Sequence, residues 1–487
     1  MAGIGFELKK LFRRKGFFAG AYAYGYAGVI CCGPMILGII LLLGVSFLAK
    51  ASGASMHERE LLNGMITTTL LAGLTVSSFL SLLVTRYIAD MLYEQKPECV
   101  MPSFWGATGI LLTAGCILYG IFLCFAGIPL LYCIACFLLF GEIVIVWTEI
   151  SYLTAVKDYQ GIFRTFGIAL LAGFLCGAIF VFVFHLPVVA SLMTAMVVSY
   201  GVMAVHYYTL LQQFFPTGEG SSLAFLHWGD TYPTLAWNGL FTNIGLFTHL
   251  IILWASDYGI QIQGLFYHCP DYDIAAVFAF LSILITTVNY VVSVEVHFYP
   301  KYRDYYALFN DKGTIVDIDL AGRDMCDTLS RELHYAAMRQ LFCTILFLVF
   351  GSVLLKKFSL GFTDEALGIF RVLCIGYGLY AIANMLMLSL LYFCDNKGSF
   401  FASGTFAIGT ILGTIASFAL PSYWRGIGFG IGALAYLVVA WLRLEYFMQS
   451  LPYHLLSRQP MIAQEKNGLL SKISNTAQKM FEKRSSI

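Results

Sequence analysis

The chain has 487 residues, of which 59% are hydrophobic and 12% are charged, and its formal net charge is +1. Soluble domains average about 25% charged residues, and a soluble protein of this length could not bury so much apolar side chain. The composition therefore excludes an ordinary soluble protein and predicts an all-α integral membrane protein. The small net charge gives no support for a nucleic-acid partner.

Apolar segments long enough to cross a bilayer recur along the chain. A transmembrane helix needs about 20 apolar residues, and the sequence predicts about twelve such helices. They are expected at 19–49, 62–91, 103–126, 128–156, 163–185, 187–212, 234–257, 273–298, 339–358, 365–393, 400–420 and 422–449. The first apolar run is too long for a signal peptide and predicts a retained helix, and the preceding "GIGFELKKLF" predicts an amphipathic segment at the membrane surface.

Polar stretches divide these helices into groups. The segment 214–233 is predicted to be a cytoplasmic linker between an N-terminal six-helix bundle at 1–213 and a C-terminal six-helix bundle at 234–450. A cytoplasmic insert at 299–338 is predicted to hold two short amphipathic helices around a turn in "GTIVDIDLAG", and a cytoplasmic tail follows at 451–487. Two related halves are a known transporter plan.

The placement of basic residues predicts the orientation. With both termini in the cytoplasm, 23 of the 29 Lys and Arg residues lie on the inner side. The other six are Lys50, Arg59, Lys356, Lys357, Arg371 and Arg425. Because cytoplasmic loops carry the excess of Lys and Arg, the sequence predicts cytoplasmic termini.

Two glutamates lie within the apolar segment 128–156. Glu142 and Glu149 are seven residues apart and so share one helical face. A charge at the bilayer centre costs roughly 3 kcal/mol, so both are predicted to face the bundle interior or a water-filled cavity. One interpretation is an ion pair, either Glu149 with Arg86 or Glu142 with Arg371. The other is a polar transport route, with a carboxylate that can also couple transport to protons.

Neutral polar residues also line predicted helices. Asn238 and His249, eleven residues apart, share a face, and Asn289 lies on a second polar stripe. A third stripe, in the second predicted helix, consists of Thr67, Ser78, Ser81 and Thr85. Small and hydroxyl residues allow close helix packing, so each stripe is consistent either with packing or with a lined pathway.

Signals for catalysis are weak. Asp317 and Asp319 form a lone D-x-D in the insert, and the sequence contains no G-x-x-x-x-G-K-[ST] phosphate loop. The thirteen cysteines show no metal-ligand pattern and are expected to pack as small apolar side chains. The sequence predicts no enzyme activity, catalytic residue, metal site or cofactor.

Several stretches resemble one family across essentially the whole chain. They are "MAGIGFELKKLF", "CCGP", "GLFYHCPDYDIA" and "VNYVVSVEVHFYPKYRDYY". Together they resemble the PelG family, the inner-membrane transporters of the Pel exopolysaccharide system. The resemblance implies a MATE-like, polysaccharide-flippase fold, with two six-helix bundles around a central cavity. It also implies transport of a polymer rich in N-acetylated hexosamines, in a synthase complex with a cytosolic glycosyltransferase and membrane partners.

Partner contacts are predicted on the cytoplasmic insert and the tail. Arg303, Tyr305 and Tyr306 combine basic and aromatic character and are candidate docking residues, although a helix lying on lipid headgroups would show the same pattern. Other functions remain compatible with the sequence: a flippase for lipid-linked oligosaccharides, an exporter of small drugs, or a membrane-embedded polymerase or acyltransferase.

Overall fold

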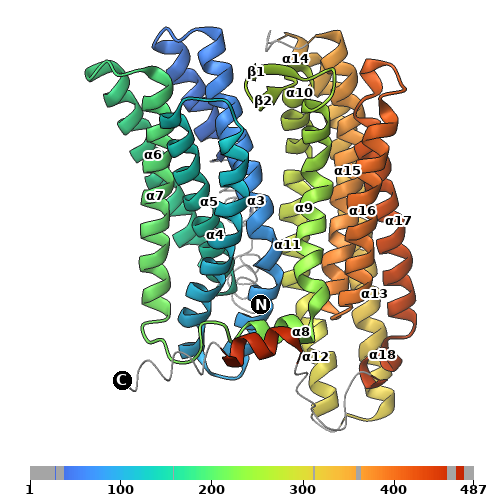
Figure 1. Ribbon diagram of the computed structural model, residues 1–487. Helices are drawn as coiled ribbons and strands as arrows, with labels where there is room; N and C mark the ends of the chain where they lie inside the picture. Colours follow the sequence, from blue (N-terminus) through green and yellow to red (C-terminus); the bar gives the residue numbers. More distant parts are fainter. Residues whose placement is uncertain are drawn as a thin grey trace, which may run out of the picture. The chain divides into compact units, whose positions relative to one another are not determined.

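The computed structural model confirms an all-α membrane fold. It describes residues 28, 38–156, 158–310, 313–357, 363–457 and 468–476. In this part of the chain, eleven helices are long and apolar enough to cross a membrane, and a shorter apolar helix covers Gly38–Ala51 (Figure 1). The protein is therefore a multi-pass membrane protein. The predicted first helix, 19–49, lies partly outside the described residues.

The described residues form two compact units. We call the first the N unit; it contains 38–244, 254–268 and 468–476. The C unit contains 245–253 and 269–457. The boundary differs from the predicted division after residue 213, because it falls within a helix and because two segments from the second half of the sequence pack with the N unit.

The N unit is a bundle in which a central helix, α5, packs against three others, α3, α4 and α7. Its long helices are α3 (Met56–Tyr93), α4 (Val100–Cys124), α5 (Leu130–Val156), α6 (Tyr159–Ala178) and α7 (Val188–Phe214). Ser55 begins α3 with a capping box to Glu58, and Asp158 caps α6 through the amide of Gly161. In the bundle core, the ring of Tyr119 stacks on that of Phe140.

Helix α9 (Pro233–Trp254) crosses the boundary between the units after Ile244, and a β-hairpin follows it. The hairpin consists of β1 (Ile260–Gln263) and β2 (Phe266–His268). It packs onto the N unit: Ile262 and Phe266 join the hydrophobic core, and the Leu265 amide donates to the Ala126 carbonyl at 3.0 Å. The chain therefore enters the C unit at Gly245, returns to the N unit at Trp254 and enters the C unit again at Cys269.

After the β-hairpin, the C unit continues with two unusually long helical stretches (Figure 1). The first comprises α10 (Pro270–Phe280), η3 (Leu281–Ile283), α11 (Leu284–Ser293), η4 (Val294–Phe298) and α12 (Tyr299–Asn310). The second comprises α13 (Ile315–Leu346) and η5 (Phe347–Gly351). Their apolar spans cover 39 and 37 residues. At about 1.5 Å per residue each is about 55–60 Å long, whereas the hydrocarbon core is about 30 Å thick.

The predicted insert 299–338 is thus the continuation of two membrane helices, which pack against each other as α12 and α13. The turn predicted in "GTIVDIDLAG" is wrong, because α13 already begins at Ile315. Thr314 accepts from the Asp317 amide, and Asp317 in turn accepts from the Thr314 amide. This capping box is a helix-start signal that the sequence reasoning overlooked.

Four further helices complete the C unit. They are α14 (Ser352–Lys357), α15 (Asp364–Tyr392), α16 (Asn396–Ser417) and α17 (Ile427–Gln449), followed by the short α18 (Leu451–Ser457). Helices α16 and α17 approach so closely that a Cβ at Gly428 would lie 2.3 Å from the Thr414 amide nitrogen. A Cβ at Gly432 would lie 2.3 Å from Thr410 Oγ1. Such small-residue contacts are the usual means of tight helix association in membranes.

Candidate functional site

The two glutamates of α5 both point into protein. Glu149 is 1% exposed, and its Oε2 has no hydrogen-bond partner among the described residues. Glu142 is half-buried; its Oε2 is likewise buried without a partner, and its Oε1 lies 3.1 Å from the Cβ position of Gly201 on α7. Buried polar atoms normally have partners, so these two acceptors need an explanation.

Of the two ion pairs considered from the sequence, the one between Glu149 and Arg86 is not formed in the described part of the chain. The Arg86 guanidinium instead pairs with Asp90 one turn along α3, with an Nε–Oδ2 distance of 3.1 Å, and lies over the Tyr232 ring. Asp90 also accepts from Trp228 Nε1 at 2.8 Å. Arg86 therefore joins α3 to the segment around α8 (Leu226–Thr231).

Asn238 is fully buried where α9 meets α3. A Cβ at the next residue, Gly239, would lie 2.4 Å from the Ser78 carbonyl oxygen, so the two helices are almost in backbone contact. Ser78 and Thr85 of the predicted stripe donate their hydroxyl hydrogens to carbonyls of their own helix. At these positions the small and hydroxyl residues serve helix packing.

His249 is fully buried in the C unit. Its Nδ1 lies 2.7 Å from the Tyr272 hydroxyl, its Nε2 lies 3.5 Å from the Tyr377 hydroxyl, and the Phe429 ring centroid is 4.6 Å away. The surrounding aromatic cluster continues through Tyr380, Phe406 and Tyr436. Both ring nitrogens thus have tyrosine neighbours, and the histidine joins α9, α10 and α15 inside the unit.

The other two candidates of the C unit also contact neighbouring helices. Asn289 on α11 is half-buried, and its Oδ1 accepts from Arg339 Nη1 on α13 at 3.0 Å. Arg371 on α15 directs its Nε at Ser352 Oγ on α14, at 3.3 Å. Each of these contacts holds two helices of the same unit together.

The three candidate docking residues of α12 lie in different environments. The side chain of Arg303 is 70% exposed and pairs with Asp304. Tyr305 is 1% exposed, with its ring against Gly322 of α13, so it does not lie on the surface of this chain as docking would require. Tyr306 is half-buried, and its ring centroid lies 4.4 Å from that of Tyr302.

Two charged groups of the C unit were missed by the sequence reasoning. Glu295 is 8% exposed and lies in η4, a π-helical segment of a membrane-crossing stretch; π-helical turns are often functional. Asp395 is fully buried and forms a bidentate pair with Arg443, at 2.6 and 3.1 Å. Each acid is a charge within or beside an apolar run, the same signal that identified Glu142 and Glu149.

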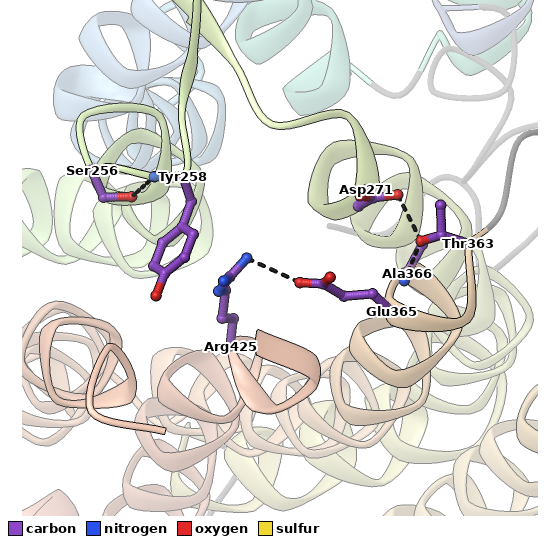
Figure 2. Close-up of polar contacts among 7 residues, drawn as sticks. All are labelled: Ser256, Tyr258, Asp271, Thr363, Glu365, Ala366 and Arg425. Atoms are coloured by element: carbon purple, nitrogen blue, oxygen red, sulfur yellow. Dashed lines mark hydrogen bonds and ion pairs between the residues drawn. The ribbon is translucent and has the colours of Figure 1, made fainter. Parts of the chain in front are cut away.

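A further cluster of polar side chains joins the start of α15 to neighbouring helices. Figure 2 shows the Arg425 guanidinium directed at Glu365, with an Nη1–Oε1 distance of 3.2 Å. Thr363 caps α15 through the Ala366 amide and donates its hydroxyl hydrogen to Asp271 at the start of α10 (Figure 2). The side chain of Arg425 is only 11% exposed. These contacts hold α10, α15 and the start of α17 together.

Comparison with known proteins gives both a family and a fold. Residues 1–456 match a family model described as "PelG: Putative exopolysaccharide Exporter (EPS-E)". None of the curated proteins matches the sequence significantly.

Solved MATE transporters are similar in fold. A point mutant of a Vibrio cholerae MATE transporter is 12% identical, with a TM-score of 0.63 over 93% of this chain and 99% of that chain. A MATE transporter in complex with MaD5 is also 12% identical, with a TM-score of 0.61 over 93% of this chain and 100% of the other. An outward-facing multidrug-resistance MATE transporter of the MOP superfamily is 13% identical, with a TM-score of 0.58 over the same shares.

Proposed function

The chain belongs to the PelG family of exopolysaccharide exporters, and from this membership we propose that it moves a growing Pel-type polymer, rich in N-acetylated hexosamines, across the cytoplasmic membrane. The MATE-like fold supports a transport mechanism based on two helical units. In this proposal the membrane is the inner membrane and both termini are cytoplasmic. The orientation is supported by the 23 of 29 basic residues that would then lie inside.

The observation that best supports a polar transport route through the protein is the pair of glutamates on α5. Both have a buried carboxylate oxygen without a partner in the described residues. A carboxylate oxygen accepts hydrogen bonds well, and sugar hydroxyl and acetamido N–H groups are donors. We assign Glu142 and Glu149 either to contact with the passing glycan or to proton coupling. Contact with the glycan would supply a hydrogen-bond donor to these oxygens, and protonation would remove the cost of burying their charge.

The remaining polar candidates have weaker claims. Arg86, His249, Asn289 and Arg371 each have partners within their own unit, as described above. Any contact they make with substrate would therefore require rearrangement of those contacts. Asn238 is buried at a close contact between helices. We therefore rank the two glutamates above these five residues as pathway residues.

A cytosolic glycosyltransferase and membrane partners complete the proposed synthase complex. The helical hairpin of α12 and α13, with the tail from residue 451 onward, is the proposed docking surface. Its support is the exposed Arg303 on α12 and three exposed apolar side chains near the start of α13: Ile315, Val316 and Leu320. Soluble surfaces rarely expose contiguous apolar groups unless they bind a partner.

A second candidate substrate class has one observation in its favour. One similar solved structure is described as a multidrug-resistance transporter. Export of small drugs, or flipping of a lipid-linked oligosaccharide, would use the same fold. The sequence shows few arginines in mid-helix to hold a pyrophosphate, which disfavours the lipid-linked substrate.

Reconstitution separates these alternatives. Vesicles containing the purified chain, with the partner glycosyltransferase and its nucleotide-sugar donors supplied on the cytoplasmic face, should accumulate polymer in the lumen. Vesicles without the chain, given the same enzyme, provide the control. Polymer that stays outside in both preparations, together with uptake of a cationic dye by the chain alone, would replace the exopolysaccharide proposal with drug export.

A further inference from the structure

The exposed face of α13 changes from charged to apolar at Tyr335. Apart from Arg339, the exposed side chains from Tyr335 to Val353 are all apolar or aromatic. They are Tyr335, Met338, Leu341, Phe342, Ile345, Val349, Phe350 and Val353. Together they cover about 27 Å of helix, which matches a hydrocarbon core about 30 Å thick. Arg339 donates to Asn289, and an arginine side chain is long enough to reach the membrane surface from this depth. Tyr335 therefore marks the place where α13 leaves the membrane.

The part of α13 that precedes Tyr335 stands outside the membrane. Six exposed side chains of this part are charged: Asp317, Asp319, Arg323, Asp324, Asp327 and Arg331. Helix α13 begins at Ile315, and at about 1.5 Å per residue the helix from there to Tyr335 is about 30 Å long. Helix α12 packs against this part of α13. The hairpin of α12 and α13 therefore projects into water, on the side that the excess of basic residues predicts to be cytoplasmic.

Contacts between its two helices make the hairpin rigid. Tyr305 of α12 is 1% exposed, and a Cβ at Gly322 of α13 would lie 3.0 Å from its ring. Leu329 of α13 is also 1% exposed. Lys301 pairs with Asp324, although exposed ion pairs add little to stability. The hairpin thus has a packed interior of its own, which holds its far end at a fixed distance from the membrane.

That far end presents an apolar patch with charges of both signs around it. Ile315, Val316 and Leu320 are 59–87% exposed, and we call these three residues the tip. Residues 315–330 contain four aspartates and one arginine, which give a net charge of −3, and all four aspartates are exposed. On α12, Arg303 adds an exposed cation. The tip is therefore bordered by acids on the α13 side and by a base on the α12 side.

A lipid surface does not fit this chemistry. The cytoplasmic leaflet is negatively charged and attracts basic segments, so it would repel the aspartates of α13. The tip also lies about 30 Å along the helix from the membrane boundary at Tyr335. Contiguous apolar side chains that remain in water usually mark contact with another protein. The charge and the position of the tip thus favour a water-soluble protein as its partner.

We propose that the hairpin is a rigid arm that binds a cytosolic protein at its tip. The partner surface that fits is an apolar groove with a basic rim facing α13 and an acidic group facing Arg303. Charges of both signs fix the orientation of the bound partner as well as its affinity. We assign the glycosyltransferase of the proposed synthase complex to this site. That identity rests on the proposed function, whereas the position of the hairpin in water does not.

The first experiment locates the tip relative to the membrane. An amino acid that carries an azide replaces either Val316 or Met338 in the full-length protein, so that a dye can be attached without reaction at native thiols. In vesicles whose lipids carry nitroxide quenchers, the dye at Met338 should be quenched and the dye at Val316 should not. Iodide in the water should quench the dye at Val316. Quenching of this dye by the lipids would show a hairpin lying on the membrane and overturn the arm, as would an unquenched dye at Met338.

The second experiment tests the charges around the tip. The full-length chain in nanodiscs is titrated with the purified glycosyltransferase. Asp319→Asn combined with Asp327→Asn should raise the Kd about tenfold, equivalent to about 1.4 kcal/mol, and high salt should narrow the difference from the parent. Glu445→Gln, which removes an exposed acid of α17, is the matched control and should leave the Kd unchanged. Equal Kd values for the parent and the double variant, or no binding by the parent, would overturn the proposed binding surface.

Polymer export separates these outcomes from failure of the proposed function. Vesicles with the parent chain that export polymer, while the double variant binds the enzyme normally, would retain the exporter and reject the binding surface. Parent vesicles that export no polymer would reject the proposed function. The quenching result still decides whether the hairpin stands in water.

Discussion

Buried acids in this protein differ in what surrounds them. Asp395 has a bidentate guanidinium partner, whereas Glu149 has an oxygen without a partner in the described residues. An ionised carboxylate buried without a cation is strongly disfavoured, so the two residues should respond differently to neutralisation. This difference separates a structural acid from a candidate mechanistic one.

Glu149→Gln should leave the amount of membrane-inserted protein unchanged, because no cation of the described residues pairs with Glu149. Polymer export per inserted protein should fall at least tenfold, equivalent to about 1.4 kcal/mol of activation free energy. Glu142→Gln tests the second carboxylate, and Glu219→Gln, at an exposed position, is the matched control. If both α5 variants export at the parent rate, neither charge takes part in transport, and helix packing is the better explanation.

Asp395→Asn should instead lower stability, because it leaves the Arg443 guanidinium without its partner. Breaking a fully buried pair costs about 3–5 kcal/mol, and the one-third exposure of Arg443 reduces the expected loss to about 2 kcal/mol. Thermal unfolding of the purified protein in detergent measures the change. The double variant Asp395→Asn with Arg443→Met should recover much of the loss; a double variant no more stable than the single one would argue against the pair.

Asp230 on α8, whose carboxylate accepts from the Ser471 amide and hydroxyl, gives a prediction about pH. Its folded-state pKa is lowered, so the stability it contributes is present above its unfolded value of about 4 and is lost only as pH falls through the folded value. A cysteine introduced at the buried Ser474 should react slowly with a maleimide, and its labelling rate reports release of residues 468–476 from Asp230. After correction for the thiolate fraction, this rate should therefore be constant from pH 6 to pH 8. A marked rise within this range would mean that some other titrating group controls release.

At the scale of elements, hydropathy predicted where the membrane helices lie. It did not predict how the polar segments between them fold. The predicted helices at 103–126 and 400–420, for example, correspond to α4 and α16. The segment 313–322 was misread because its glycines and aspartates favour turns, while the capping box of Thr314 and Asp317 is a two-residue signal within it. The contact between Asp230 and Ser471 could not be predicted, since it joins residues 241 positions apart.

The hairpin of α12 and α13 provides a prediction at this scale. Replacement of Ile315, Val316 and Leu320 by serine should lower co-purification of the glycosyltransferase without lowering protein level, because all three side chains are exposed. Arg303→Ala should act in the same direction. Unchanged co-purification in both variants would show that the glycosyltransferase does not dock on this hairpin.

Two variants control this experiment. Met56→Ser removes an equally exposed apolar side chain on the side predicted to be opposite. Tyr305→Ala should lower protein level through a core cavity, by about 3 kcal/mol of stability, because its ring is buried. A loss of co-purification in Tyr305→Ala would therefore be a stability effect rather than evidence for docking.

The orientation of the whole molecule can be tested at two exposed acids. Cysteine at Asp257, between α9 and β1, should react with a membrane-impermeant maleimide added to spheroplasts whose cytoplasmic membrane is intact. Cysteine at Asp327 on α13 should react only after lysis. Both expectations follow from the excess of basic residues on the inner side. Labelling of the second site before lysis would show that the proposed orientation is wrong and that the hairpin of α12 and α13 lies outside the cytoplasm.

Gly229 and Asp230 of α8, which we call the α8 platform, contact residues 468–471, and this contact has a consequence for biosynthesis. The α8 platform is made about 240 residues before the helix that covers it, and a ribosome adds about 5–20 residues per second. For roughly 10–50 s the nascent N unit therefore presents Gly229 and Asp230 uncovered, while the helices of the C unit are still being inserted. The N unit is thus one of the first parts of the protein to enter the membrane and one of the last to be completed, and a chaperone or a neighbouring nascent chain could occupy the platform in the interval.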